Sequence, residues 1–215
     1  MSIKSTNPAT NKVVQTFEEM TEPALEQSIA TAVETFASWK KTPYAERAAL
    51  LHKVAGLLRE NKKDLAQLIT LEMGKLLSQA EGEIKLSAEI FDYYANHAEE
   101  FLTDKVLKPV HGQALVRNSP IGVLLGVQPW NFPFYQVARF AAPNIMVGNT
   151  ILLKHASLVP QCALAIEKLF LEAGAPIGLY TNLLISGERA SELVADVRIK
   201  GVSLTGSEAA GASVA

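Results

Sequence analysis

The sequence predicts an α/β protein in which a doubly wound parallel sheet follows a helical N-terminal region. Two patterns indicate this fold. In the first hundred residues, apolar side chains recur three or four positions apart, the spacing of amphipathic helices. From Ile121 onward, short apolar runs alternate with helical segments, which is typical of parallel βαβ units. With 215 residues, 48% of them hydrophobic, the chain is long and apolar enough to bury a core.

One strand and then helices are expected in residues 1–101. The alternating segment VVQTF, 13–17, predicts the strand. Thr21 is expected to cap the first helix, Thr42 and Pro43 to open the second, and Gly74 to end the third. A long fourth helix is expected from about Ser78 to Phe101. The carboxylates of this region are interpreted as solvated helix surface, and they include Glu46, Glu72, Glu81 and Glu83.

Residues 102–118 show neither the helical pattern of residues 1–101 nor the alternating pattern of residues 119–215. Proline and glycine interrupt two short β-like pieces there, which predicts a hairpin or bridging arm. Residues 119–215 then alternate: IGVLLGV, TILLK, TNLLISG and IKGVSLTG predict strands, with helices after each of them. The sequence stops inside EAAGASVA, a helical pattern without a cap, so we expect a truncated chain.

Composition disfavours several classes of protein. The net charge of −2 favours neither nucleic acid nor a membrane surface as a partner, and no apolar run spans a bilayer. The polar N-terminus lacks the apolar core of a signal peptide, so a cytoplasmic protein is expected. The single cysteine, Cys162, lies in an apolar helical segment and is interpreted as a buried, inert thiol. No histidine pair has metal-ligand spacing, so no metal site is expected.

The segment GVQPWNFPFYQV, 126–137, is the first candidate site. Pro129 removes a backbone donor and Pro133 disfavours helical backbone at Phe132, so the loop should be stiff and extended. Between these two prolines, Asn131 is the only side chain that carries both an amide donor and an acceptor. The residue types therefore indicate a positioned hydrogen-bond donor, or alternatively a cap on the following helix.

Two more polar stretches follow predicted strands, and ligands of open α/β sheets bind beyond the carboxyl ends of strands. Lys154 is positioned to bond ribose hydroxyls or a 2′-phosphate, or is a surface lysine at a strand end. A small residue, Ser157, leaves room for such a phosphate. Gly206 and Ser207 open a helix whose N-terminus favours a pyrophosphate, although Ser207 is equally typical of an ordinary cap. The fingerprint GxGxxG is absent, which argues against a plain Rossmann dehydrogenase.

The chain resembles the N-terminal half of an aldehyde dehydrogenase along nearly its whole length. NPAT, LEMGK, PIGVLLGVQPWNFP, ILLKHAS, the AGAP-G spacing and SLTGSEAAG carry the resemblance, and PWNFP followed by TGS-xxx-G is a specific signature. The text around LLKHAS is most similar to the succinate-semialdehyde dehydrogenase branch. A related reductase of acyl phosphates or acyl thioesters, and a non-catalytic nucleotide-binding or oligomerisation module, stay open as alternatives.

The resemblance implies a Rossmann-like NAD(P)-binding part and a role for each stretch. Asn131 would donate its side-chain amide to the oxyanion of a thiohemiacetal. Ser157, where an acidic residue would favour NAD, indicates NADP or use of both cofactors. The arm would pair subunits of a homodimer or homotetramer. The family's catalytic cysteine and general-base glutamate would lie beyond this chain, which should be inactive alone. The residues expected to bind the cofactor are Val127, Gln128, Pro129, Trp130, Asn131, Lys154, His155, Ala156, Ser157, Gly187, Gly206 and Ser207.

Overall fold

A four-stranded parallel sheet forms the centre of the protein, for which a computed structural model describes residues 2–214. Its strands are β5 (Val123–Gln128), β6 (Thr150–His155), β7 (Tyr180–Asn182) and β8 (Ile199–Leu204). They lie in the order β7-β6-β5-β8. The four strands predicted from the apolar runs are all present, and their parallel pairing confirms the predicted α/β class.

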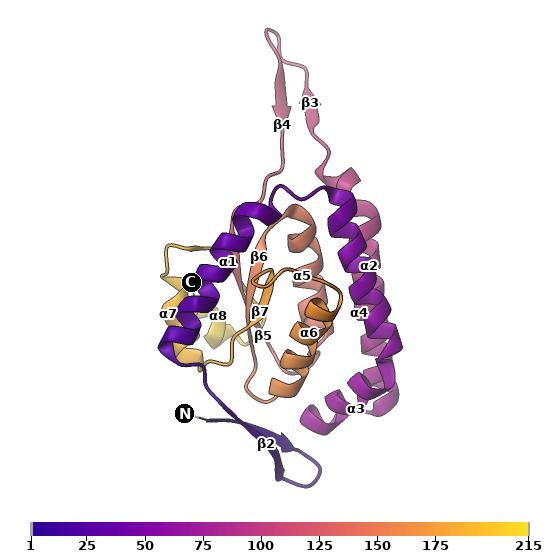
Figure 1. Cartoon of the computed structure of the whole chain (residues 1–215), viewed down its shortest axis with the longest axis vertical. Coiled ribbons are helices and arrows are strands. Elements are labelled where there is room, and N and C mark those ends of the chain that lie inside the picture. Colours follow the sequence, from indigo (N-terminus) through magenta and orange to yellow (C-terminus); the bar gives the residue numbers. More distant parts are fainter. Residues whose placement is uncertain (1, 215) are drawn as a thin grey trace.

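Helices cover both faces of this sheet, as the doubly wound prediction requires. On one face lie α5 (Tyr135–Val147) and α6 (Pro160–Glu172), and beyond them the long helices α2 (Tyr44–Glu60) and α4 (Leu77–Leu102) (Figure 1). The other face packs against α1 (Glu22–Trp39) and α7 (Gly187–Val194). The short helix α8 (Glu208–Val214) follows β8. No helix within residues 2–214 is long and apolar enough to cross a membrane.

The N-terminal region contains one strand more than the sequence predicts. β1 (Ser2–Asn7) pairs antiparallel with β2 (Lys12–Glu18), and only β2 is expected from the sequence pattern. The predicted helix boundaries are confirmed: Thr21 Oγ1 accepts a hydrogen bond from Ala24 N at 3.3 Å, and α3 (Lys62–Met73) ends at Gly74. Gly74 has a φ of 76°, the left-handed conformation that favours glycine at a helix end.

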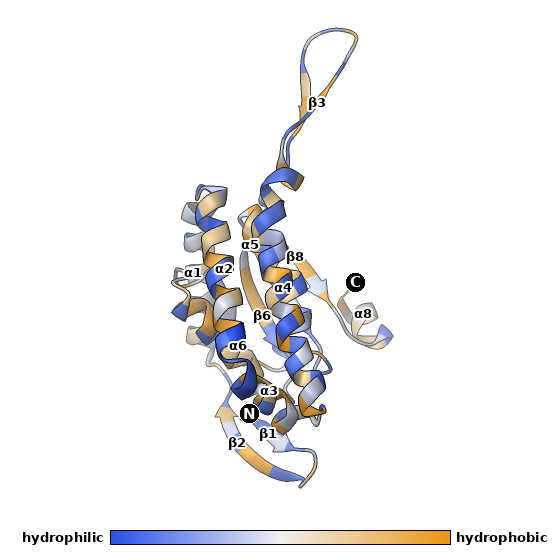
Figure 2. Ribbon diagram, turned by 90° about the vertical axis from the view of Figure 1, so that its right-hand side faces the viewer, coloured by the Kyte–Doolittle hydropathy of each residue, from blue (hydrophilic) through white to orange (hydrophobic). Residues whose placement is uncertain are grey.

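A hairpin arm projects from the body. It consists of β3 (Lys105–Leu107) and β4 (Ala114–Val116), and it lies at the end of the molecule opposite the β1–β2 hairpin (Figure 1). Figure 2 shows apolar positions along the arm, and Val106 and Val110 are 76% and 91% exposed. The body thus leaves the apolar side chains of the arm uncovered.

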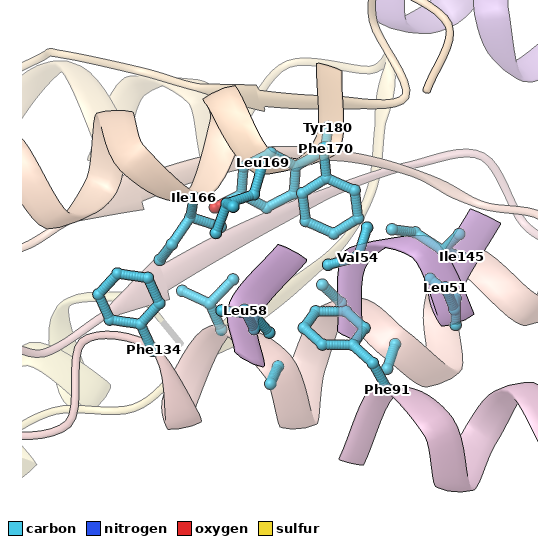
Figure 3. Packing of buried hydrophobic residues seen from close by; sticks show 14 of the residues in the cluster. Leu51, Val54, Leu58, Phe91, Phe134, Ile145, Ile166, Leu169, Phe170 and Tyr180 are labelled. Atoms are coloured by element: carbon cyan, nitrogen blue, oxygen red, sulfur yellow. The ribbon is translucent and has the colours of Figure 1, made fainter. Parts of the chain in front are cut away.

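The larger core cluster fills the space between the sheet and the helices α2, α4, α5 and α6 (Figure 3). Aromatic rings connect its layers: the Phe170 ring packs edge-on against Phe91 at 5.7 Å and stacks on Tyr180 at 4.5 Å. Phe134, only 2% exposed, enters the same cluster directly after the segment PWNFP. The loop that carries Asn131 is therefore anchored in the core at its C-terminal end.

Candidate functional site at the carboxyl edge of the sheet

Three loops meet at the carboxyl ends of the parallel strands. In the sheet register, Val127 pairs with Lys154 on one side and with Leu204 on the other. The chain winds from β5 through β6 to β7 in one direction, whereas β8 lies on the opposite side of β5. This reversal creates a topological switch point between β5 and β8, the place where open α/β sheets bind ligands. The structure thus brings together the stretches QPWN, KHAS and TGS.

A cavity of about 280 Å³ lies at this edge, between the strand ends and the helices α7 and α8. Its walls are mostly apolar and include Val127, Leu204, Ala210 and Val214. Lys154 is the charged residue of the lining. Burial lowers the pKa of the Lys154 ammonium, and no carboxylate within residues 2–214 is near enough to oppose this shift. A partly desolvated ammonium without a protein counter-ion suits a ligand that carries phosphate or hydroxyl groups.

A larger cavity, about 340 Å³, lies at the opposite edge of the sheet. It is lined by Val33, Phe36, Ile121 and Val197, among others, beside the amino ends of β5 and β8. Parallel sheets bind their ligands at the carboxyl ends of the strands, and the polar stretches all lie there. We therefore assign the candidate site to the smaller cavity.

The two-residue period of the strands divides the predicted site residues between the two faces. Val127 and Lys154 face the cavity, whereas Gln128 and His155 point into the opposite face and are only 3% and 5% exposed. The His155 Nε2–H donates to the Pro133 carbonyl at 3.0 Å, and Nδ1 accepts from Ala156 N at 2.9 Å. The structure therefore turns the His155 side chain away from the cavity and toward the PWNFP loop.

The loops after β5 and β6 are joined by their backbones. Ala156 N donates to the Gln128 carbonyl at 2.9 Å, which holds the two strand ends in register. Ser157 comes next and is exposed, at the start of the turn that leads into α6. Two glycines lie at the N-terminal ends of α7 and α8. Gly187 begins α7 and lines the cavity, whereas Gly206 lies just before α8 and is exposed.

Ser207 caps a helix, which is the simpler of the two roles that the sequence indicates for it. Its Oγ accepts a hydrogen bond from Ala210 N at 3.3 Å, so it caps α8. This bond occupies the hydroxyl as an acceptor but leaves its proton free to point elsewhere. Capping and ligand binding are therefore compatible at Ser207.

Asn131 lies in an exposed part of the PWNFP loop, next to Trp130, which is 46% exposed. Within residues 2–214 the Asn131 side chain makes no hydrogen bond, and the helix amides that it would cap have another partner. Glu83 Oε1 accepts from Phe134 N at 2.8 Å and from Tyr135 N at 3.2 Å. The capping alternative for Asn131 is therefore wrong, and its amide is available to a ligand.

Two of the glutamates interpreted as helix surface are buried, which corrects that prediction. Glu83 is 4% exposed, and Glu72 is 3% exposed and caps α6 by accepting from Gln161 N and Cys162 N at 3.0 and 2.8 Å. Burial, together with the negative charge of Glu72, raises the pKa of the Cys162 thiol. The prediction that Cys162 is a buried, inert thiol is confirmed in its burial.

Lys75 and Glu83 contact the PWNFP loop and the start of α5, and the sequence pattern did not lead to these contacts. Lys75 Nζ donates to the backbone carbonyl of Asn131 at 2.8 Å and forms an ion pair with Glu83. Helical spacing would have identified Glu83, because it falls on the buried stripe of α4 between Ala80 and Ser87. Nothing in the local pattern identifies Lys75, which lies in the short connection between α3 and α4.

Comparisons with known proteins show what this chain is similar to. The sequence model of the aldehyde dehydrogenase family matches residues 1–215. The chain is 49% identical, over 97% of its length, to a succinate-semialdehyde dehydrogenase [NADP(+)] of Deinococcus radiodurans, and it covers 44% of that protein. A probable succinate-semialdehyde dehydrogenase [NADP(+)] of Synechocystis sp. is also 49% identical, with 100% of this chain and 47% of the relative covered. The chain thus spans about half the length of the curated relatives it matches.

A solved structure shares the fold. A succinic semialdehyde dehydrogenase from Streptococcus pyogenes, in complex with NADP+, superposes with a TM-score of 0.96 at 46% identity, and the match covers 99% of this chain and 47% of that one. The family model matches the whole length of the chain, and the fold matches that of a solved relative. The chain belongs to the aldehyde dehydrogenase family.

Proposed function

We propose that the protein containing this chain oxidises an aldehyde to a carboxylic acid with NADP, and that its substrate is succinate semialdehyde. The relatives from Deinococcus radiodurans and Synechocystis sp. are named for this activity, which supports the substrate class. The observation that carries the proposal is the switch-point geometry: an exposed amide at Asn131 lies in the loop after β5, and the cavity beside Lys154 opens at the same edge. The cytoplasmic location stays a prediction.

The residues around the cavity fit a phosphorylated dinucleotide. The Lys154 ammonium, partly desolvated and without a counter-ion in the described chain, would bond the adenosine ribose or its 2′-phosphate. Ser157 would leave room for that phosphate, which supports NADP over NAD. Gly206 and Ser207 would lie along the pyrophosphate, with Val127 and Gly187 as apolar and backbone walls. When bound, the nicotinamide supplies the acceptor for a hydride.

Asn131 would act on the reacting carbonyl. A thiolate attacks the aldehyde carbon, the carbonyl oxygen becomes an oxyanion, and the Asn131 amide donates a hydrogen bond to it. Trp130 and Pro129 would line the nicotinamide end of the site. Cys162 does not supply the thiolate, because it is buried and its thiol pKa is raised. We propose that the cysteine and the general-base glutamate lie outside these 215 residues.

The test starts from the natural gene product. Its intact mass is compared with the 23.2 kDa of this sequence, and NADP-dependent oxidation of succinate semialdehyde is assayed. Replacing Asn131 by alanine should lower kcat about 10²–10³-fold, because one oxyanion donor is lost. The control is Asn96→Ala, an exposed asparagine on α4, which should leave kcat unchanged. NADP binding without turnover in the unmodified gene product would favour a non-catalytic nucleotide-binding module instead.

The arm formed by residues 102–118 would join subunits, as the family resemblance implies. Its exposed apolar side chains, including Val106 and Val110, support this proposal, since the body of the chain does not cover them. The expected assembly is a homodimer or homotetramer.

A further inference from the structure

The peptide of Asn131 has little backbone support of its own. Pro129 and Pro133 lack N–H groups, and neither Trp130 nor Asn131 takes part in a backbone–backbone hydrogen bond within the described chain. A loop held only by proline stiffness would still pivot about its remaining dihedral angles. The orientation of the Asn131 amide must therefore be fixed by contacts from elsewhere.

Lys75 supplies such a contact. Its Nζ donates to the Asn131 carbonyl at 2.8 Å and lies 3.7 Å from the centre of the Phe132 ring. The Lys75 side chain is only 8% exposed. A charge-assisted hydrogen bond to a carbonyl is stronger than a neutral one, and the ring contact fixes the next residue as well. One ammonium thus restrains two consecutive residues of the loop.

Glu83 holds both Lys75 and the far end of the loop. One carboxylate oxygen, Oε2, pairs with Lys75 Nζ, while Oε1 accepts from Phe134 N and Tyr135 N. The Glu83 side chain is 1% exposed, and its carboxylate lies at the N-terminus of α5, where the helix dipole favours a negative charge. The pair therefore connects α4, and the segment just before it, to Asn131 and to the residues that follow Asn131.

We propose that Lys75 and Glu83 are positioning residues that orient the Asn131 amide for catalysis. The inference rests on the proposed role of Asn131. A purely structural ion pair would need only the cap that Glu83 places on α5, whereas Lys75 reaches past this helix end to the carbonyl of the proposed donor itself. A displacement of about 1 Å in such a donor is enough to lower a rate about 10²-fold.

The test uses the double substitution Lys75→Met with Glu83→Gln in the natural gene product. It removes both charges together and so leaves no unpaired buried ion, and the amide oxygen introduced by Glu83→Gln still accepts from the α5 amides. The matched control is Glu72→Gln, a buried glutamate that caps α6 in the same way without touching residues 129–133. The double variant should lose roughly 10²-fold in kcat with the KM for NADP unchanged, and the control should keep its kcat.

A double-mutant cycle with Asn131→Ala separates an effect on the position of Asn131 from a general structural effect. If Lys75 and Glu83 act through Asn131, the double substitution should lower kcat no further once that amide is gone. Losses that multiply, or a kcat unchanged by the double substitution alone, would overturn the proposal.

A second readout does not depend on activity. This chain has two tryptophans, Trp130 beside the donor and the buried Trp39, and 5-fluorotryptophan labelling gives each of them a ¹⁹F resonance. The double variant should shift or broaden the Trp130 resonance and leave that of Trp39 in place, and Glu72→Gln should change neither. If the unmodified protein oxidises no aldehyde, the proposed function fails, yet the Trp130 resonance still decides whether this pair holds the loop. An unchanged Trp130 resonance would overturn the inference.

Discussion

His155 is a buried histidine whose neutral form is built into the structure. Burial lowers the pKa of its imidazole to about 4, against the opposing effect of the Pro133 carbonyl and with a smaller contribution from the nearby Lys154 charge. The Nε2–H donates to that carbonyl while Nδ1 accepts from Ala156 N, so the neutral ring satisfies both of its nitrogens. Protonation would place a charge in a site that offers Nδ1 no acceptor.

This environment predicts a loss of stability as the pH falls. An unfolded histidine titrates near 6.5, so between about pH 6.5 and pH 4 the unfolded chain binds a proton that the folded chain does not. The unfolding free energy should therefore decrease through this window, by about 3 kcal/mol in total. Replacing His155 by glutamine retains a donor for the Pro133 carbonyl and removes the titration. Urea unfolding from pH 7.5 to 5 should show a shallower slope for the variant; parallel curves would contradict the prediction.

Some helix ends depend on a side chain that belongs to another helix. Arg47 of α2 donates to the carbonyls of Met146 and Val147 at 2.8 and 2.9 Å, where α5 ends. It also donates to the carbonyls of Trp39 and Lys40 at 3.2 and 3.0 Å, where α1 ends. The residue is 4% exposed, and burial lowers the pKa of its guanidinium, which still stays charged. One side chain thus satisfies the last carbonyls of two helices.

Replacing Arg47 by methionine should destabilise the fold by on the order of 3 kcal/mol, because buried carbonyls lose their donor. Arg47→Lys should recover part of this loss, since an ammonium cannot span four carbonyls. The matched control is Arg59→Met on the same helix, whose exposed ion pair with Asp92 contributes less than about 1 kcal/mol. Urea unfolding followed by circular dichroism measures all three changes. Equal effects of the two methionine substitutions would show that Arg47 has no special role.

The distance along the chain between a capping residue and its helix decides whether the sequence predicts the cap. The capping roles of Thr21 and Gly74 can be recognised in the sequence because each residue lies directly next to the helix that it begins or ends. The capping roles of Glu72 and Glu83 have no local sequence signal, since the helices that they cap lie in a distant part of the chain. The strand β1 is missed because its segment SIKSTN carries little apolar character, although Ile3 and Ser5 are buried.

At the scale of the whole molecule, the sequence predicts the sheet but not the order of its strands. Alternating apolar runs identify β5 to β8, and parallel pairing follows from the helices between them. The position of β8 next to β5 is a long-range contact, and this contact creates the switch point. The sequence could therefore name the polar loops, but only the fold shows that Lys154 faces the cavity and that His155 faces the loop.

The arm makes the oligomeric state testable. Val106 on β3 pairs with Leu115 on β4, and these side chains are 76% and 51% exposed. Burying such apolar surface drives subunit association, so its removal should weaken the assembly. The substitutions Val106→Lys and Leu115→Glu make the arm polar, yet they leave an opposite-charge cross-strand pair that supports the hairpin itself. Sedimentation of the natural gene product should then show smaller assemblies than for the unmodified protein.

The control for the arm is Val13→Lys, because Val13 is 53% exposed on the other hairpin, at the opposite end of the molecule (Figure 1). It removes a similar apolar side chain and adds one charge without touching the arm. If the arm joins subunits, this variant should sediment like the unmodified protein. Equal dissociation by both changes would mean that surface charge, rather than the arm, governs assembly. If the arm variant assembles like the unmodified protein, the projecting hairpin takes no part in the subunit contact.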